Sequence, residues 1–209
     1  MSNVPVDLEA VRQAIASGDP SRAMPALAGL REVSEEQATP LLLLGLEQDT
    51  FIIRSLACAG LGVKRSEAGW QALEARLGGD GDANVRAEAA NALASYGVER
   101  SWPLLLQAFR ADSQWLVRCS ILSALAEQQA MRPEWLLELG RLAIADADGT
   151  VRVGGAEVLG RMVAEAAQGS PAGVEGPTPA AEARAALQRL QHDSDHRVVA
   201  AALNGLQPC

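Results

Sequence analysis

The sequence predicts an all-α fold, a right-handed α-solenoid of about six helix pairs in a single repeat domain over residues 1–209. Three observations lead to this prediction. Hydrophobic residues make up 48% of the chain, mostly alanine and leucine, while aromatic residues make up only 3%, which favours helices. A short motif recurs along the chain. An amphipathic stretch precedes each copy, and one such pair of helices could not bury its apolar face alone.

The recurring motif contains Asp, a β-branched residue followed by Arg, several small residues and a closing Leu. Clear copies occupy residues 49–61, 80–93, 112–125 and 146–159. A fifth copy, residues 193–206, has Val199 at the Arg position. The β-branched column and the leucine column both step by 32, 32, 34 and 47 residues. Periods of this size are typical of helical repeats.

The expected helix pairs follow in order along the chain. They cover about residues 5–33, 35–64, 67–98, 100–131, 133–167 and 179–207. Asp19 and Pro20 suit the N-cap and first position of the second helix in the first pair, and Asp at the later turns is also a good N-cap. The Gly/Pro-rich residues 168–179 predict a loop insertion. Gly154 and Gly155 inside a helix predict a flexible joint.

Each second helix has an apolar side and an opposite side. With the motif Arg as position 0, positions −1, +3, +4 and +7 share one side and hold apolar residues, such as Val85 and Leu93. Positions +2 and +5 point away from that side. They hold Leu56, Ala59, Glu88, Asn91, Ser120, Ser123, Gly154 and Glu157. This mixed surface suits a protein partner better than a reaction pocket.

Composition also narrows the partners and the location. The chain has 18 Lys and Arg against 26 Asp and Glu, a net charge of −8 that would repel a phosphate backbone, so no nucleic acid is expected to bind. The apolar stretch 40–46 is too short to span a membrane, and the N-terminal residues do not resemble a secretory signal. Three cysteines without a CxxC pair suit a reducing compartment. We therefore expect a cytoplasmic protein.

Residues 82–93, DANVRAEAANAL, resemble a HEAT repeat of the short type found in the phycobilisome-lyase HEAT-like family of cyanobacteria, and the resemblance covers roughly residues 35–207. FIIRSLACAGLG and WLVRCSILSAL further resemble a cyanobacterial HEAT-repeat partner of an A-type iron-sulfur carrier. The resemblance implies bilin attachment or removal as a lyase subunit, help in phycobilisome turnover, or non-catalytic binding. The partners it implies are a phycobiliprotein, a second HEAT-like subunit or an iron-sulfur carrier.

A metal-dependent function is less well supported by the residues. The related deoxyhypusine hydroxylase holds a di-iron centre with repeated His-Glu pairs, whereas this chain has only His192 and His196, neither followed by Glu. Their i, i+4 spacing would suit a metal pair on a continuous helix, but Asp193 and Asp195 mark a turn. We therefore expect no metal and no cofactor.

Two columns of side chains have both a functional and a structural interpretation. Arg54, Arg86, Arg118 and Arg152 form the first column. They could bind bilin propionates or acidic partners. The resemblance instead implies a structural ladder with the Asp-rich turns, and we favour it; those turns contain Asp49, Asp82, Asp112 and Asp148. The second column, Trp70, Trp102 and Trp135, is interpreted as packing between helices rather than a ligand-stacking strip.

The cysteines offer one further kind of site. Cys58 at position +4 is expected to be buried and inert, whereas Cys119 at +1 and Cys209 at the chain end are candidate interface thiols. Cys58 and Cys119 lie two repeats apart, roughly 20 Å at one helix diameter per repeat, which is too far for a shared cluster or disulfide.

No motif of a nucleophilic or phosphate-binding enzyme is recognisable, and no catalytic residue is assigned. The resemblance implies that positions +2 and +5 line the concave face of the solenoid. The sequence thus predicts a non-catalytic scaffold that holds a protein on this concave face and rim. The predicted contact residues are Leu56, Glu88, Asn91, Ser120, Ser123, Glu157, and the rim aromatics Phe51 and Trp115. A phycobilin lyase subunit, the enzymatic alternative, and a partner in iron-sulfur cluster assembly remain open.

Overall fold

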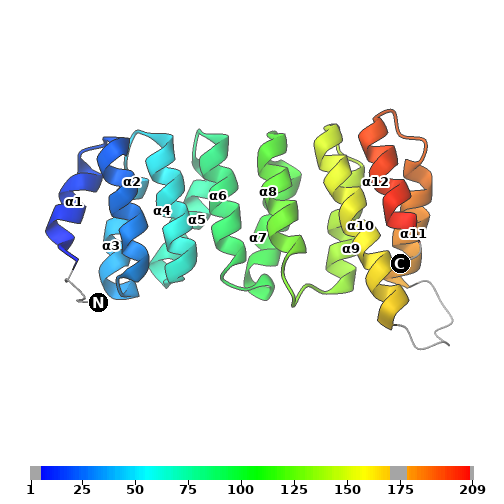
Figure 1. Cartoon of the computed structure of the whole chain (residues 1–209), viewed down its shortest axis with the longest axis horizontal. Coiled ribbons are helices and arrows are strands. Elements are labelled where there is room, and N and C mark those ends of the chain that lie inside the picture. The colour runs from blue at the N-terminus through cyan, green and yellow to red at the C-terminus, as the bar shows by residue number, and fades with distance from the viewer. Residues whose placement is uncertain (1–5, 170–177, 208–209) are drawn as a thin grey trace. The chain divides into compact units, whose positions relative to one another are not determined.

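The computed structural model describes residues 6–169 and 178–207, and in these residues it contains twelve α-helices, a short 3-10 helix and no strand (Figure 1). Consecutive α-helices form six pairs: α1 (Leu8–Ala16) with α2 (Pro20–Gly29), α3 (Glu35–Leu46) with α4 (Phe51–Lys64), α5 (Glu67–Gly79) with α6 (Ala83–Ala94), α7 (Val98–Ala111) with α8 (Trp115–Ala126), α9 (Pro133–Ile144) with α10 (Gly149–Gly169), and α11 (Pro179–Leu190) with α12 (His196–Leu206). The 3-10 helix η1 (Leu30–Glu32) extends α2. The predicted all-α fold of about six helix pairs is confirmed.

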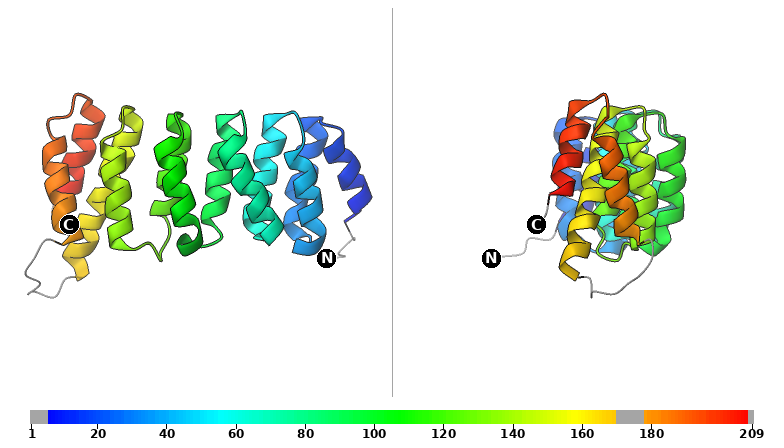
Figure 2. Two further views of the ribbon diagram at one scale, coloured as in Figure 1. Left: turned by 180° about the vertical axis from the view of Figure 1, so that it is seen from behind. Right: turned by 90° about the vertical axis from the view of Figure 1, so that its right-hand side faces the viewer.

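The chain divides into two compact units, one up to Ser120 and one from Ile121 onward, so that α8 contributes to both. In the first unit the second helices pack side by side, α2 on α4 and α4 on α6. The first helices α3 and α5 lie on the other side of this layer, as the reverse view in Figure 2 shows. In the second unit α10 packs against α9, α11 and α12.

Aspartates shape the turn before most second helices in two different ways. The first Asp of the motif accepts a hydrogen bond from the backbone N–H two residues ahead, as Asp80 does from Asp82 at 3.0 Å and Asp193 from Asp195 at 2.8 Å. Asp82 and Asp195 are then the N-caps of α6 and α12. Asp19 caps α2 with Pro20 in its first turn, as the sequence predicted. The N-cap of α4 is Thr50, whose side chain makes no capping hydrogen bond.

The apolar side of each second helix forms the core. Positions −1, +3, +4 and +7 are buried in α4, α6, α8 and α10, and Val85 and Leu93 of α6 have no exposed surface. The pattern breaks in α12, where Leu203 at +4 is 48% exposed. No described helix follows α12 to cover that position, because the described residues end at 207. Burial at these four positions therefore depends on the neighbouring repeat.

The glycines of α10 are explained by close packing. A Cβ atom on Gly155 would lie 2.7 Å from the Cβ of Ala143 in α9, and one on Gly160 would lie 2.7 Å from the Cα of Gly205 in α12. Helix α10 runs unbroken from Gly149 to Gly169, so the position of the predicted flexible joint is regular helix. These glycines allow the backbones to approach closely.

The predicted loop over 168–179 begins two residues too early. Residues 168 and 169 belong to α10, and α11 begins at Pro179. The preceding turns contain the strong helix former alanine and an ion pair between Arg161 and Glu165, four residues apart at 3.4 Å, which support the longer helix. The rest of the predicted insertion, residues 170–177, lies outside the described residues.

Candidate functional site

Arg54 connects the turns of two consecutive repeats. Its Nε and Nη2 donate to Oδ2 and Oδ1 of Asp80 at 2.8 and 3.0 Å, and Asp80 lies in the turn before α6. Its Nη1 donates to the backbone carbonyls of Gln48 and Asp49, at 2.9 and 2.7 Å, in the turn before its own helix. One guanidinium group therefore holds two turns together with charge-assisted hydrogen bonds.

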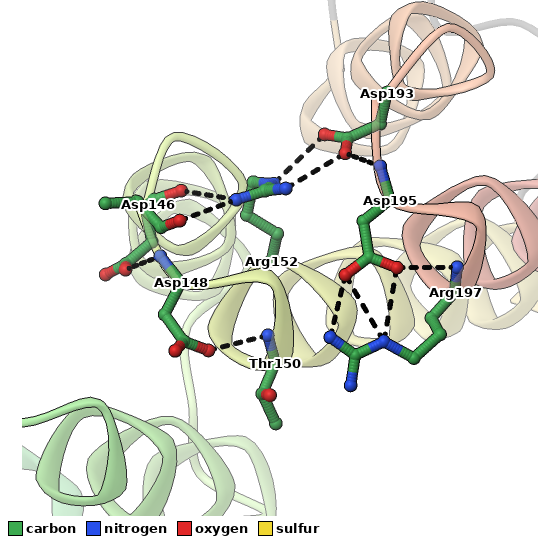
Figure 3. Close-up of polar contacts among 8 residues, drawn as sticks. Asp146, Asp148, Thr150, Arg152, Asp193, Asp195 and Arg197 are labelled. Carbon is green, nitrogen blue, oxygen red and sulfur yellow. Dashed lines mark hydrogen bonds and ion pairs between the residues drawn. The ribbon is translucent and has the colours of Figure 1, made fainter.

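The same geometry recurs in both units. Arg86 donates to both carboxylate oxygens of Asp112 at 2.7 and 3.1 Å, and Arg152 donates to both oxygens of Asp193 at 3.0 Å (Figure 3). Arg118 donates from Nη1 to the carbonyl of Asp112 in its own turn at 2.8 Å. We call the pairs Arg54–Asp80, Arg86–Asp112 and Arg152–Asp193 the arginine–aspartate ladder.

The ladder differs from the sequence prediction in its carboxylate partners. The prediction placed Arg54, Arg86 and Arg152 beside Asp49, Asp82 and Asp148, whereas each carboxylate partner belongs to the next repeat. Asp49 contributes a backbone carbonyl, and Asp82 caps α6. The partner lies 26 residues ahead of Arg54 and 41 residues ahead of Arg152, because stacking brings the following turn alongside.

The ladder aspartates are held in their charged form. The side chain of Asp80 is only 1% exposed. This burial raises its pKa, but hydrogen bonds from Arg54 and from the amide of Asp82 outweigh the effect, so that the pKa of Asp80 lies below its usual value. The hydrogen bond from Arg152 likewise lowers the pKa of Asp193. Since Arg54 and Arg152 already bond within the chain, the ladder geometry favours a structural role over anion binding.

The C-terminal ends of second helices are also fixed to their neighbours. Lys64 at the end of α4 donates to the backbone carbonyls of Arg31 and Val33. The hydroxyl of Ser95, after α6, donates to the carbonyl of Gly62 in α4 at 2.6 Å. In the first unit, α4 and α6 therefore contact neighbouring repeats at both of their ends. These contacts fix the position of the backbone that carries their exposed face.

The tryptophan column is largely buried. Trp70 and Trp102 are 8% and 6% exposed. The ring of Trp70 meets Tyr96 edge to face, with centroids 5.4 Å apart, and the Arg100 guanidinium lies 3.9 Å from its centroid. Trp135 is half-buried with the guanidinium of Arg132 4.4 Å from its ring centroid. These contacts are those of packed side chains.

The rim aromatics have a different environment. Phe51 and Trp115 are the first residues of α4 and α8, and they are 42% and 46% exposed. Both lie in the first unit, three residues before the motif Arg of their helices. They present large apolar surface at helix ends, which is the kind of anchor that protein interfaces use.

The predicted contact face contains two grooves between second helices. All six predicted helix-face residues are at least partly exposed: Leu56, Glu88 and Ser120 are half-buried, and Asn91, Ser123 and Glu157 are exposed. In the first unit a groove of about 260 Å³ runs between α2 and α4, and Leu56 lines it. In the second unit a groove of about 270 Å³ runs between α8 and α10, and Ser123 and Glu157 line it.

The sequence did not predict the grooves themselves. The α2–α4 groove is also lined by residues of α2, which the degenerate first repeat hid from motif comparison. The spacing of Leu56, Ala59, Gly60 and Val63 along α4 was an available signal, since it places small and apolar residues on one helix side. A third groove, of about 660 Å³, lies on the first helices and includes Leu43, Leu44 and an ion pair of Glu47 with Arg76 at 2.5 Å.

The thiols and imidazoles do not form a cluster in the described part of the chain. Cys58 is fully buried, and burial raises its pKa to about 12, which keeps it a thiol. Cys119 is half-buried on α8, and Cys209 lies outside the described residues. His192 and His196 are exposed and are separated by the turn before α12. Among residues 6–169 and 178–207 no group of three metal-binding side chains gathers, and no helix could span a membrane.

The repeat class follows from the comparisons with known proteins. A family model described as HEAT repeats matches residues 39–126, the region of α3 to α8. Residues 39–126 therefore contain HEAT repeats. No curated protein sequence matches the chain.

Solved structures of repeat proteins share the fold. An engineered protein is 19% identical over 97% of this chain and 98% of its own, with a TM-score of 0.54. A designed armadillo repeat protein is 20% identical over 96% and 98%, with a TM-score of 0.52. Human deoxyhypusine hydroxylase in complex with glycerol is 15% identical over 96% and 94%, with a TM-score of 0.49. At these identities the first two matches describe the fold alone.

Proposed function

We propose that this HEAT-repeat protein is a non-catalytic cytoplasmic scaffold that binds a partner protein on the face formed by its second helices. The observation that carries the proposal is the apolar groove between α2 and α4, which opens on this face beside Leu56. The helices on either side are held by the ladder and by Lys64, so the face is preorganised. A preorganised face loses less conformational entropy when a partner binds.

Groove size supports a protein partner over a tetrapyrrole at this face. The grooves of about 260 and 270 Å³ fall below the roughly 300–1,000 Å³ that is common for small-molecule sites. Such grooves accommodate individual side chains of a partner. Phe51 and Trp115 add exposed aromatic surface at the ends of the same helices.

A subunit of a phycobilin lyase is the alternative, and the groove of about 660 Å³ on the first helices provides room for a larger ligand. This alternative predicts that the protein, mixed with phycocyanobilin and an apo-phycobiliprotein, forms an acid-stable coloured adduct. A scaffold leaves the pigment extractable by acid. The same assay with the substitution Leu44→Asp tests whether the groove on the first helices holds the pigment.

A role beside an iron-sulfur carrier makes a different prediction. Replacing Cys119 and Cys209 by Ser would abolish an iron-dependent complex that uses interface thiols. A complex that survives both substitutions depends on the helix face instead. Iron content and complex mass, measured together, separate the two outcomes.

The scaffold proposal is tested by affinity capture from a cyanobacterial lysate, the source that the motif resemblance suggests. The bait is the intact protein, a variant with Leu56→Asp and Ser120→Arg, or a control with Ala68→Asp and Gln71→Arg on the exposed side of α5. A partner lost only with the first variant supports binding at the second helices. Equal capture by all three baits contradicts the proposal, and capture lost only with the α5 control moves the site to the first helices.

A further inference from the structure

The groove between α2 and α4 has apolar walls and an apolar floor. On α4 the spacing of Leu56, Ala59 and Val63 places all three on one side of the helix, facing Ala28 on α2. Leu27, Leu30 and Leu42 complete the lining from below. The groove is therefore continuous with the hydrophobic core of the first unit.

Gly60 allows α4 to pack closely on Leu42 below the groove. A side chain at this position would collide with Leu42, whose methyl groups occupy the space next to the glycine Cα. The same motif position is Ala92 in α6, where the side chain is buried. The absence of a Cβ atom in α4 thus lets Leu42, which has no exposed surface, pack directly beneath the groove.

The groove leaves apolar surface in water. Val63 is 53% exposed, although it lines the groove, and Met24, one helical turn before Ala28 on α2, is 37% exposed. Single exposed apolar residues are common on protein surfaces. Exposed apolar residues that adjoin a groove continuous with the core are typical of a binding site.

The charge of the groove selects the class of partner. Its lining contains two cations, Arg31 and Lys64, and no carboxylate, although the whole chain carries a net charge of −8. Lys64 is held by the carbonyls of Arg31 and Val33. Arg31 is exposed at the groove, and its guanidinium makes no hydrogen bond or ion pair to another described residue. It is the group that can receive a carboxylate.

We propose that this groove binds a segment of a partner protein in which a large apolar side chain stands next to Asp or Glu. The apolar side chain contacts Leu56, Ala59 and Val63, and the carboxylate accepts hydrogen bonds from Arg31. The volume of about 260 Å³ limits the groove to one or two side chains. This inference rests on the proposed function and specifies the partner chemistry for the same face.

The test is peptide selection on the full-length protein with a phage-displayed library of random dodecapeptides. We expect enrichment of a large apolar residue adjacent to Asp or Glu. A synthetic peptide with the enriched sequence, labelled for fluorescence anisotropy, should bind Val63→Asp and Arg31→Glu roughly tenfold more weakly each, the equivalent of losing one charge-assisted hydrogen bond or one apolar contact. The control Gln71→Asp, on the exposed side of α5, should change its affinity less than twofold.

The charge reversal supplies a second readout that loss of folding cannot imitate. Selection on Arg31→Glu should replace Asp and Glu in the enriched peptides by Lys and Arg, with circular dichroism unchanged. Acidic peptides selected equally by Arg31→Glu, apolar peptides without an acidic residue, or no enrichment at all would each overturn this inference. None of these results affects the capture experiment, which tests the scaffold proposal separately. Binding that survives Val63→Asp would also overturn the assignment to this groove.

Discussion

Replacing Arg54 by alanine tests whether the ladder stabilises the repeat stack. The substitution removes both hydrogen bonds to Asp80, whose carboxylate is 1% exposed. The amide of Asp82 at 3.0 Å and Arg76 at 3.8 Å remain beside that carboxylate. Removing one partner of a buried ion pair costs about 3–5 kcal/mol, and with these remaining groups we expect a loss of about 2–3 kcal/mol in the free energy of unfolding.

The measurement is urea unfolding at pH 7, followed by circular dichroism. Arg141→Ala is the matched control, because it removes an ion pair with Glu182 whose side chains are 56% and 39% exposed, and such a pair contributes below about 1 kcal/mol. A double variant, Arg54→Ala with Asp80→Asn, should recover part of the loss, since no charge is then left buried without its cation.

The pH dependence of the free energy of unfolding provides an independent test of the ladder. The pKa of Asp80 is lower in the folded state than its unfolded value of about 3.9, so the pair stabilises the fold above that pH. The stabilisation is lost as the pH falls through the folded pKa, and the difference between wild type and Arg54→Ala should shrink with it. Equal losses for Arg54→Ala and Arg141→Ala, or a difference independent of pH, would refute the ladder as a source of stability.

Three further predictions concern the turns, the glycines and the buried thiol. Because hydrogen bonds lower the pKa of Asp193 and Asp195, the free energy of unfolding of the wild type should decline below about pH 4 and stay nearly constant above about pH 5, as urea titrations at each pH will show. Gly155→Ala should cost about 1–3 kcal/mol in urea unfolding by overpacking against α9, whereas Gly78→Ala, with no atom within 4 Å of the added Cβ, should be neutral or stabilising by up to about 1 kcal/mol. With its pKa raised to about 12 by burial, Cys58 should resist iodoacetamide at neutral pH until urea unfolds the protein, and rapid labelling of native protein, mapped by mass spectrometry, would contradict its burial.

Much of the fold could be predicted because the same spacing of apolar residues recurs in each copy of the motif. The positions of Val85 and Leu93 recur in register through the motif copies, and a helix with that spacing can bury only one side. The end of α10 was less predictable, because glycine near 168 suggested a loop while the preceding alanines extend the helix. Helix ends depend on small free-energy differences that a repeat motif does not record.

The candidate site was predictable in part. Leu56, Ser123 and Glu157 were placed on the second-helix face from spacing alone, and all three line grooves. Arg31 and Val63 were not identified, since the first repeat lacks the motif and position +9 lies beyond it. A groove forms between two helices, so its lining depends on which helices become neighbours.

By itself the sequence determined the helix pairs, the buried side of each second helix and the presence of arginine in successive turns, because these depend on spacing within a single motif. The tertiary structure added that the carboxylate beside Arg54 belongs to the next turn and that Gly60 lets the buried Leu42 pack beneath a groove. Both features arise where one repeat stacks on another. The contacts that join repeats link residues far apart in the chain, and their geometry is set by how closely the helices approach.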